Sequence, residues 1–509
     1  MAILEPAPPD APQTPPCTLS ASLRCLGPGM ILAGAIVGSG ELIATPKVGA
    51  EAGFWLLWLI ILGCTLKVFV QIEFGRHTIT WGQTALAALD SLPGPRWKVN
   101  WLLWYWFAVV LLIISQNGGI VGGVGQALSM AMPITADGEE YNRVQDDLVR
   151  ARVVLAEARR EAVPAAEVAS LEQSTADLSL RAADLDEPHD ELLWATVVAL
   201  LTSVIMWFGR YKFIEIVSTL LVGAFTVVTL IALYMLQSTP WAVSAENVAQ
   251  GLRFRLPPGD TTGAGLATAL SAFGMIGLSA GEIIMYPYWC LEKGYAAHTG
   301  PRAQTPEWAA RASGWMRVLQ LDVWLSMFVY TFSTVAFYLL GAAVLGRTAL
   351  SPEGEGMIRT LAQMYVPVFG EWAEGLFLFG AVTVLYSTYF VFAAGFARII
   401  ADALILLGLI NDTAASRALW RQILSVSLPL LALVVFLFVR APVEMVLAAG
   451  LGQATVLPML GAAALYFRYY RIDTRLRPPL ISDMLLWLSF AGLLIIGVWS
   501  LYSNFVPRD

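Results

Sequence analysis

The stretch VGSGELIATPK, residues 37–47, interrupts a long apolar segment near the start of the chain. Gly38, Ser39 and Gly40 are poor residues for the middle of a membrane helix, and Glu41 follows them directly. A glutamate suits the first turn of a helix that restarts after a break, because the backbone dipole is positive there. The stretch therefore predicts a broken helix whose free backbone groups face protein or a water-filled cavity.

A second stretch, LSAGEIIMYP at residues 278–287, repeats the pattern. In both stretches a Gly-Glu pair is followed by two aliphatic residues and then by a proline. The two stretches fall in the first and sixth apolar spans, where a transporter built from inverted repeats places its broken helices and its substrate site. The residues that we expect to bind substrate are therefore Gly38, Ser39, Gly40, Ser279, Ala280 and Gly281.

The composition is typical of a polytopic membrane protein. Of 509 residues, 57% are hydrophobic and 14% are charged, which is too apolar for a soluble enzyme. The four cysteines and three histidines are scattered, and the chain has no nucleotide-binding loop or nucleophile motif. We therefore expect no catalytic residue, no cofactor and no nucleic-acid partner. The expected partners are the lipid bilayer and a small inorganic ion.

Eleven stretches are long and apolar enough to cross a bilayer, which needs ~20 residues. They are 27–49, 53–75, 99–130, 192–208, 212–237, 264–291, 318–345, 370–398, 418–439, 443–468 and 480–503. The chain then divides into a disordered Pro-rich tail (1–23), spans one to three (24–134), an insertion (135–191) and spans four to eleven (192–509). Lysine and arginine gather in the loops after even-numbered spans, which predicts an integral protein of a prokaryotic inner membrane with the N-terminus inside and the C-terminus outside.

The insertion at 135–191 is the one long polar segment between spans, and it is strongly acidic. Apolar residues recur in it at heptad-like spacing, namely Val144, Leu148, Ala151 and Leu155, and then Val168, Leu171 and Leu178. The sequence VPAAE at 163–167 is typical of a turn. We expect an extracytoplasmic helical hairpin. Either a solvated decoration or a protein-docking module fits this pattern.

Three segments resemble a known family. GPGMILAGAIVGSGELIATPKVGAEAGFWLLW (27–58), GRYKFIEIVSTLLVG (209–223) and ALSAFGMIGLSAGE (269–282) are similar to spans one and two, five and six of the Nramp family of proton-coupled divalent metal transporters. The resemblance covers roughly 24–470, apart from the insertion. It implies an all-α fold of eleven helices, with the LeuT-like five-plus-five inverted repeat, broken helices 1 and 6, and alternating access.

The chain departs from this family at the residues that hold the metal. Family transporters carry Asp-Pro-Gly-Asn at the first break, where this chain has Gly38-Ser39-Gly40-Glu41. The family methionine of span 6 aligns with Gly281, and the acids of span 3 align with Gln116 and Gly119. Because soft and carboxylate ligands set the preference for transition metals, we expect neither Mn²⁺ nor Fe²⁺ transport by the usual ligands.

Three ionisable residues lie deep within spans: Glu41, Glu282 and Lys67. Such residues are functional candidates in membrane proteins. A lysine near two glutamates favours an anion, and glycine-rich breaks expose backbone N–H groups that could cradle it. In this hypothesis one glutamate pairs with Lys67 and the other couples transport to H⁺ or Na⁺. A structural ion pair of Lys67 with Asp322 or Glu73 is the alternative.

The sequence thus leaves three hypotheses. The first is a secondary transporter of a small anion such as bicarbonate, coupled to H⁺ or Na⁺. The second is a Mg²⁺-type divalent cation transporter with Glu41 and Glu282 as ligands, and the third is a non-transporting sensor or scaffold. Further polar residues could line the pathway or bind Na⁺, or only form hydrogen bonds within and between helices; they are Ser387, Thr388, Gln116 and Gln453.

Overall fold

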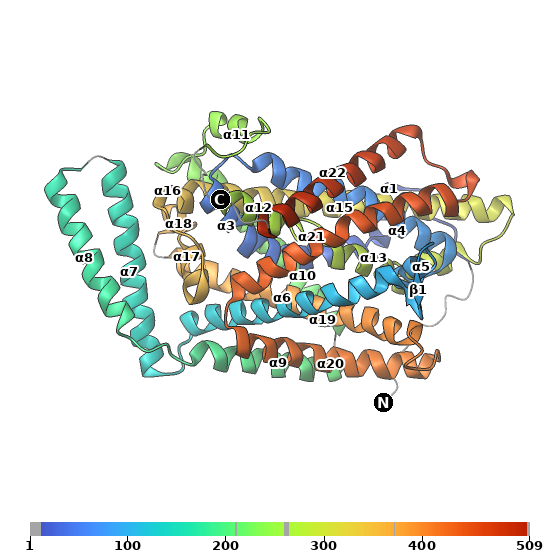
Figure 1. Ribbon diagram of the computed structural model, residues 1–509, viewed down its shortest axis with the longest axis horizontal. Coiled ribbons are helices and arrows are strands. Elements are labelled where there is room, and N and C mark those ends of the chain that lie inside the picture. The colour runs from blue at the N-terminus through green and yellow to red at the C-terminus, as the bar shows by residue number, and fades with distance from the viewer. Residues whose placement is uncertain (1–11, 162, 209–210, 259–263, 371, 506–509) are drawn as a thin grey trace.

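The computed structural model describes residues 12–505 except 162, 209–210, 259–263 and 371. Nine helices in this described part are long and apolar enough to cross a membrane. One of the nine is the interrupted first span, Pro28–Ala52. The other eight contain the long helices α4 (Leu57–Trp81), α6 (Trp101–Ala131), α9 (Asp190–Trp207), α15 (Pro306–Leu340), α19 (Trp372–Leu406), α20 (Ala414–Val439), α21 (Pro442–Tyr466) and α22 (Leu480–Phe505), and α10 (Tyr211–Met235) is a further long helix outside this count. They run roughly along the long axis of the molecule (Figure 1).

The predicted number of eleven spans stays a prediction. The sixth predicted span is divided into two helices that are each too short to cross alone, and the fifth contributes a shorter apolar helix at Val222–Ser238. Short elements connect the spans: α1 (Leu19–Cys25), α5 (Ala85–Asp90), η2 (Leu236–Ser238), α11 (Ala245–Gly251), α14 (Tyr295–Thr299), η3 (Gly341–Leu345), α16 (Gly346–Thr348), η4 (Gly354–Gly356), α17 (Met357–Ala362), α18 (Val366–Phe369), η5 (Phe467–Arg471) and η6 (Thr474–Leu476). Two-residue strands β1 (Arg96–Trp97) and β2 (Val99–Asn100) form one antiparallel pair.

Both predicted breaks are present. The first span consists of α2 (Pro28–Ile36), the π-helical turn η1 (Ser39–Ala44) and α3 (Thr45–Ala52). The sixth consists of α12 (Ala264–Phe273) and α13 (Ala280–Glu292), separated by irregular backbone. Gly277 adopts a φ of 64° in this second break, a left-handed conformation that glycine adopts without steric cost. The glycines that interrupt both apolar stretches therefore mark the points where the helices end.

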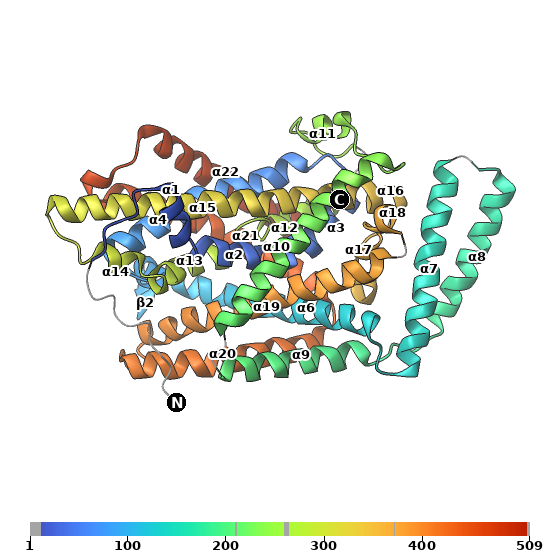
Figure 2. The same cartoon turned by 180° about the vertical axis from the view of Figure 1, so that it is seen from behind.

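The insertion forms two helices, α7 (Ala136–Arg160) and α8 (Ala165–Ala183), which project together from one end of the bundle (Figure 1). Val144 and Leu148 of α7 pack against Ala182 of α8. The turn is shorter than predicted, because α8 already begins at Ala165 after Pro164. The same end of the bundle carries α16, α17 and α18 in both views (Figure 2).

The hairpin is attached to the bundle by two arginines. Arg359 of α17 is buried and donates to the main-chain and side-chain oxygens of Asn142, at 2.8 Å each, and to Asp146. Arg160 donates to the carbonyl of Pro240 at 2.6 Å and stacks on Trp241. Hydrogen bonds that involve a charged group are the stronger ones, so these contacts hold the hairpin in place.

We predict a pH-dependent contribution from Asp146 to this attachment. Burial raises the pKa of Asp146 from its ordinary value of 3.8 to about 6, although the positive charge of Arg359 acts to lower this pKa. Between pH 7 and pH 5 the folded protein therefore takes up a proton that the unfolded chain does not, and this group stabilises the fold as the pH falls. In Asp146→Asn the gain in melting temperature from pH 7 to pH 5 should be smaller than in wild type by about 1–3 °C. An identical pH response in both proteins would contradict this prediction; the exposed Asp177→Asn on α8 is the control.

Two segments differ from the prediction. Residues 12–23 of the predicted disordered tail (1–23) are ordered against the bundle: the Gln13 N–H donates to the His298 carbonyl, the Trp315 indole N–H donates to the Gln13 carbonyl, and α1 begins at Leu19. Residues 1–11 lie outside the described part. The seventh span also begins earlier than residue 318, because α15 extends to Pro306. Its added turns bury Trp308 against Leu476 of η6, a contact between distant segments that local hydropathy does not reveal.

Candidate functional site

The first break is formed by close contact between spans one and eight. A Cβ atom at Gly38 would overlap with both Oγ1 and Cβ of Thr388 on α19. The Thr388 hydroxyl donates to the carbonyl of Ala35 at 2.7 Å and to that of Val384 at 3.2 Å. Ser387 makes a longer bond of 3.4 Å to the carbonyl of Gly34. The two hydroxyls predicted to line the pathway thus lie at the carbonyl end of α2, and Na⁺ binding there stays a prediction.

Glu41 of η1 reaches across to the second break. Its side chain is buried, and Oε1 accepts hydrogen bonds from the backbone N–H of Gly277 at 3.0 Å and from the Thr334 hydroxyl at 3.1 Å. Its other oxygen, Oε2, is buried and has no hydrogen-bond partner among the described residues. Thr334 of α15 was not predicted, since a single threonine in an apolar span carries no distinguishing signal. Glu41 therefore connects the two breaks and keeps one oxygen available.

Glu282 lies in the first turn of α13, as its position after the break predicted. Its Oε2 accepts from the Ser279 N–H at 2.6 Å, and the Ser279 hydroxyl accepts from the Glu282 N–H at 3.2 Å. This reciprocal arrangement is a capping box, which pairs two backbone donors that the helix itself leaves free. Glu282 thus stabilises the restart of the helix while its carboxylate stays at the break.

The predicted pathway residues Gln116 and Gln453 meet at the same break. Gln453 of α21 accepts from the Gly281 N–H at 3.1 Å and donates to Oε1 of Gln116 on α6 at 2.9 Å. Residues from spans three, six and ten are thereby linked in one buried chain. Sequence reasoning named all three residues but could not show that they touch, because they are far apart in the sequence.

Lys67 is completely buried, and its ammonium nitrogen donates to the carbonyls of Phe273 at 2.5 Å and Ile276 at 2.8 Å. The predicted ion pairs of Lys67 are therefore wrong. Asp322 instead accepts from the N–H groups at the start of α2, and Glu73 pairs with two arginines. Within the described part of the chain, Lys67 forms no ion pair with either glutamate of the breaks. Carbonyls at the C-terminal end of α12 attract it, because that end of a helix is negative.

This geometry corrects the predicted anion cradle. The backbone donors of the second break are already used: Gly277 donates to Glu41, Ser279 to Glu282, Gly281 to Gln453 and Glu282 to Ser279. Lys67 is likewise directed at carbonyl oxygens. An anion would have to displace these contacts one by one, because an N–H group has a single proton to donate. Among the described side chains at the breaks, the buried Oε2 oxygen of Glu41 has no hydrogen-bond partner, and a carboxylate oxygen favours a cation.

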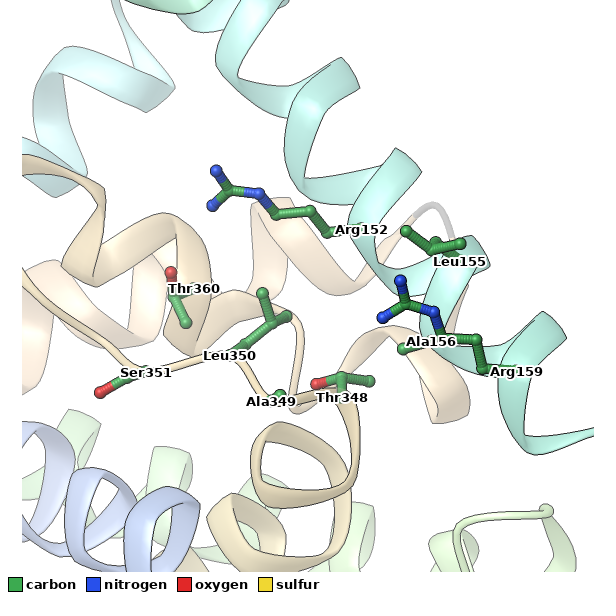
Figure 3. A pocket seen from close by; sticks show the side chains of 9 residues that line it. All are labelled: Arg152, Leu155, Ala156, Arg159, Thr348, Ala349, Leu350, Ser351 and Thr360. Atoms are coloured by element: carbon green, nitrogen blue, oxygen red, sulfur yellow. The ribbon is translucent and has the colours of Figure 1, made fainter. Parts of the chain in front are cut away.

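No cluster of three or more His, Cys, Asp or Glu residues that could hold a metal occurs in the described ranges. A site at the breaks would therefore combine at most two carboxylates with amide, carbonyl or water oxygens, which are the ligands of hard cations. A separate cavity of about 270 Å³ lies between α7 and the segment after α15, where Arg152 and Arg159 face Thr348 and Thr360 (Figure 3). It shares no residue with the breaks, so we treat it as distinct from the site.

Comparison with known proteins identifies the class. The model of the Nramp family, described as natural resistance-associated macrophage protein-like, matches residues 164–503. The chain therefore belongs to the Nramp family, in agreement with the resemblance found in the sequence. The matched segment leaves out the first break, where the chain has Gly38-Ser39-Gly40-Glu41.

Relatives and solved structures agree with this assignment. The chain is 27% identical over 113 residues to the divalent metal cation transporter MntH of Caldanaerobacter subterraneus subsp. tengcongensis, a match that covers 22% of this chain and 26% of that relative. A mutant of the manganese transporter of Eremococcus coleocola matches with a TM-score of 0.64 at 13% identity, covering 98% of this chain and 91% of the other. MhsT in complex with L-phenylalanine matches with a TM-score of 0.54 at 16% identity, over 94% and 98%. At these identities the structures show the fold, and the predicted LeuT-like fold is confirmed.

Proposed function

We propose that this chain is a membrane transporter of a hard divalent cation, with Mg²⁺ as the best-fitting substrate. The observation that carries the proposal is the buried Oε2 atom of Glu41, which has no partner among the described residues. A buried carboxylate oxygen without a partner is costly unless a proton or a cation satisfies it. The printed names of the relatives, a divalent metal cation transporter and a manganese transporter, point to the same class of substrate.

The ligand set favours Mg²⁺ over softer metals. Glu41 and Glu282 supply oxygen ligands at the two breaks, and Gln453 and Gln116 supply neutral oxygens beside them. Mg²⁺ keeps several water molecules and is held by one or two carboxylates, whereas softer transition metals such as Zn²⁺ and Cu⁺ are selected by nitrogen and sulfur ligands. Protonation of Glu41 when the cation leaves would satisfy Oε2, so we propose H⁺ as the coupling ion. The bicarbonate hypothesis has no support in the comparisons.

Transport in proteoliposomes tests this function. Purified protein would be reconstituted with a Mg²⁺-sensitive dye inside, and an inward Mg²⁺ gradient imposed; Mn²⁺ and bicarbonate gradients, the latter with an internal pH dye, form parallel arms. We expect Mg²⁺ uptake, and at least a ~10-fold loss of its rate in Glu41→Gln, because metal affinity depends steeply on such oxygens. The amide keeps the Oε1 acceptor and removes the charge.

The transport test has one control variant and two results that would contradict the Mg²⁺ proposal. Glu140→Gln, an exposed change on the hairpin, should transport as wild type does. A bicarbonate signal that is lost in Glu41→Gln, without any metal signal, would restore the anion hypothesis. Absence of all three signals with folded protein would favour the sensor or scaffold hypothesis.

We further propose that the hairpin lies on the outer side of a prokaryotic inner membrane, with the N-terminus inside and the C-terminus outside. The opposite end of the bundle supports this topology. There Arg302 and Arg471, from the loops after the sixth and tenth spans, both stack on Trp81 at the end of the second. Positive residues at one end are typical of the cytoplasmic side. Labelling of a cysteine placed at exposed Ser174 by an impermeant reagent in whole cells tests the orientation.

A further inference from the structure

Lys67 is bound in the way that a free monovalent cation would be bound. Its ammonium nitrogen contacts two main-chain carbonyl oxygens, those of Phe273 and Ile276, and lies 4.6 Å from the centre of the Phe273 ring. Carbonyl oxygens and an aromatic face are both electron-rich groups that attract cations. Lys67 is one of the largest completely buried side chains of the protein, so no water replaces these contacts.

The position of these carbonyls explains why a positive charge is needed there. Phe273 is the last residue of α12, and the carbonyls at the end of a helix have no partner within the helix. In a membrane interior such groups must be satisfied by protein or by a bound ion. At broken helices of transporters, C-terminal helix ends and unwound carbonyls commonly coordinate a coupling cation. Lys67 supplies that charge from the neighbouring span.

One peptide group joins this cation to the proposed substrate ligand. The carbonyl of Ile276 accepts from Lys67, and the N–H of the same peptide unit, carried by Gly277, donates to Oε1 of Glu41. Hydrogen bonds in a chain polarise and strengthen one another. Removal of the ammonium would weaken the bond to Glu41 and leave the carbonyls of Phe273 and Ile276 unpaired.

We propose that Lys67 is a tethered cation that takes the place of a monovalent coupling cation at the sixth-span break and orients Glu41 through the Ile276–Gly277 peptide. The orientation of Glu41 matters for transport only if the proposed function holds, whereas occupancy of the carbonyl site does not depend on it. This break then binds no Na⁺ or K⁺ in the wild-type protein. Replacement of Lys67 by an uncharged residue should open a monovalent cation site.

Thermal unfolding of the purified protein tests this without any transport measurement. Lys67→Met introduces an unbranched side chain one atom shorter than that of lysine and removes the charge, so the variant should melt below wild type in choline chloride. Na⁺ or K⁺ at constant ionic strength should raise its melting temperature by about 2 °C or more beyond any effect on wild type. Lys47→Met is the matched control, because Lys47 is also buried but is paired with Glu51 and Glu353 rather than with carbonyls.

The outcomes of this experiment either support or overturn the proposal that Lys67 is a tethered cation. A cation-dependent stabilisation of Lys67→Met that is absent from wild type and from Lys47→Met supports the proposal, even if no substrate is ever transported. Equal responses in all three proteins overturn it. If Lys67→Met does not fold, Lys67→Gln is measured in the same salts. Failure of both variants to fold in every salt, while Lys67→Arg folds, also overturns it, since no free cation then substitutes for the ammonium.

Discussion

Replacement of Gly38 by alanine should disrupt the first break and abolish transport. The added Cβ atom would occupy the position of the Thr388 side chain, and rotation about the Thr388 side-chain bond gives no relief because the Cβ of Thr388 is itself 2.5 Å away. Insertion of one methyl group into a packed core costs about 1–3 kcal/mol, and an overlap with a fixed Cβ atom lies at the upper end. The melting temperature and the transport rate of Gly38→Ala, each compared with wild type, measure this effect.

The double variant Gly38→Ala/Thr388→Gly separates steric overlap from other causes. It removes the atoms that the new methyl group would meet, so much of the lost stability should return. Gly38→Asp, which would place the family's metal-binding residue back at this break, should fail for the same reason unless Thr388 is also changed. A stable, active Gly38→Ala protein with Thr388 intact would show that the two spans do not touch as described.

Replacement of Asp322 by alanine should cause the second large loss. Asp322 accepts hydrogen bonds from the N–H groups of Gly27 and Gly29, at 3.0 and 2.5 Å, and from the Tyr286 hydroxyl at 3.1 Å. Alanine would leave these three donors unpaired, at a cost of about 1–3 kcal/mol for each one that water cannot reach. The free energy of unfolding should fall accordingly, and chemical denaturation of the purified protein measures it.

Two further variants define the origin of this loss. Asp322→Asn retains one acceptor oxygen and should fall between wild type and alanine. Asp412→Ala removes an exposed carboxylate that pairs only with Arg417 on the described surface, and it should change stability by no more than about 1 kcal/mol. If Asp322→Ala unfolds as wild type does, then the start of α2 is not held by this carboxylate.

The sequence predicted the features that depend on local residue type. The glycine interruptions located both breaks, and Glu282 took the helix-start position expected of an acid after a break. Apolar length located the nine candidate spans of the described residues, because a bilayer fixes how many apolar residues a helix needs. The sequence also identified Gln116 and Gln453 as polar residues within otherwise apolar spans.

The partners of these residues could not be predicted, because they lie on distant spans. Lys67 was paired with carboxylates in the sequence hypotheses, since charge suggests an opposite charge, but backbone carbonyls at a helix end satisfy it instead. The sequence lists side chains, and it does not show which backbone carbonyl and N–H groups need a partner. The same limitation made the glycine-rich break look like an anion cradle, whereas Glu41, Gln453 and the Ser279–Glu282 capping box already use its N–H groups.

The attachment of α2 at both ends has a consequence for the turnover number of transport. This nine-residue rod is held by Asp322 at its first turn and by the Thr388 hydroxyl at its last. The bonds to Asp322 involve a carboxylate, whereas the bond from Thr388 is neutral and therefore weaker. If α2 swings to admit or release an ion, the end at Gly38 should detach first and the Asp322 end should act as the pivot. The turnover number would then respond to Thr388→Ala more than the affinity for substrate does.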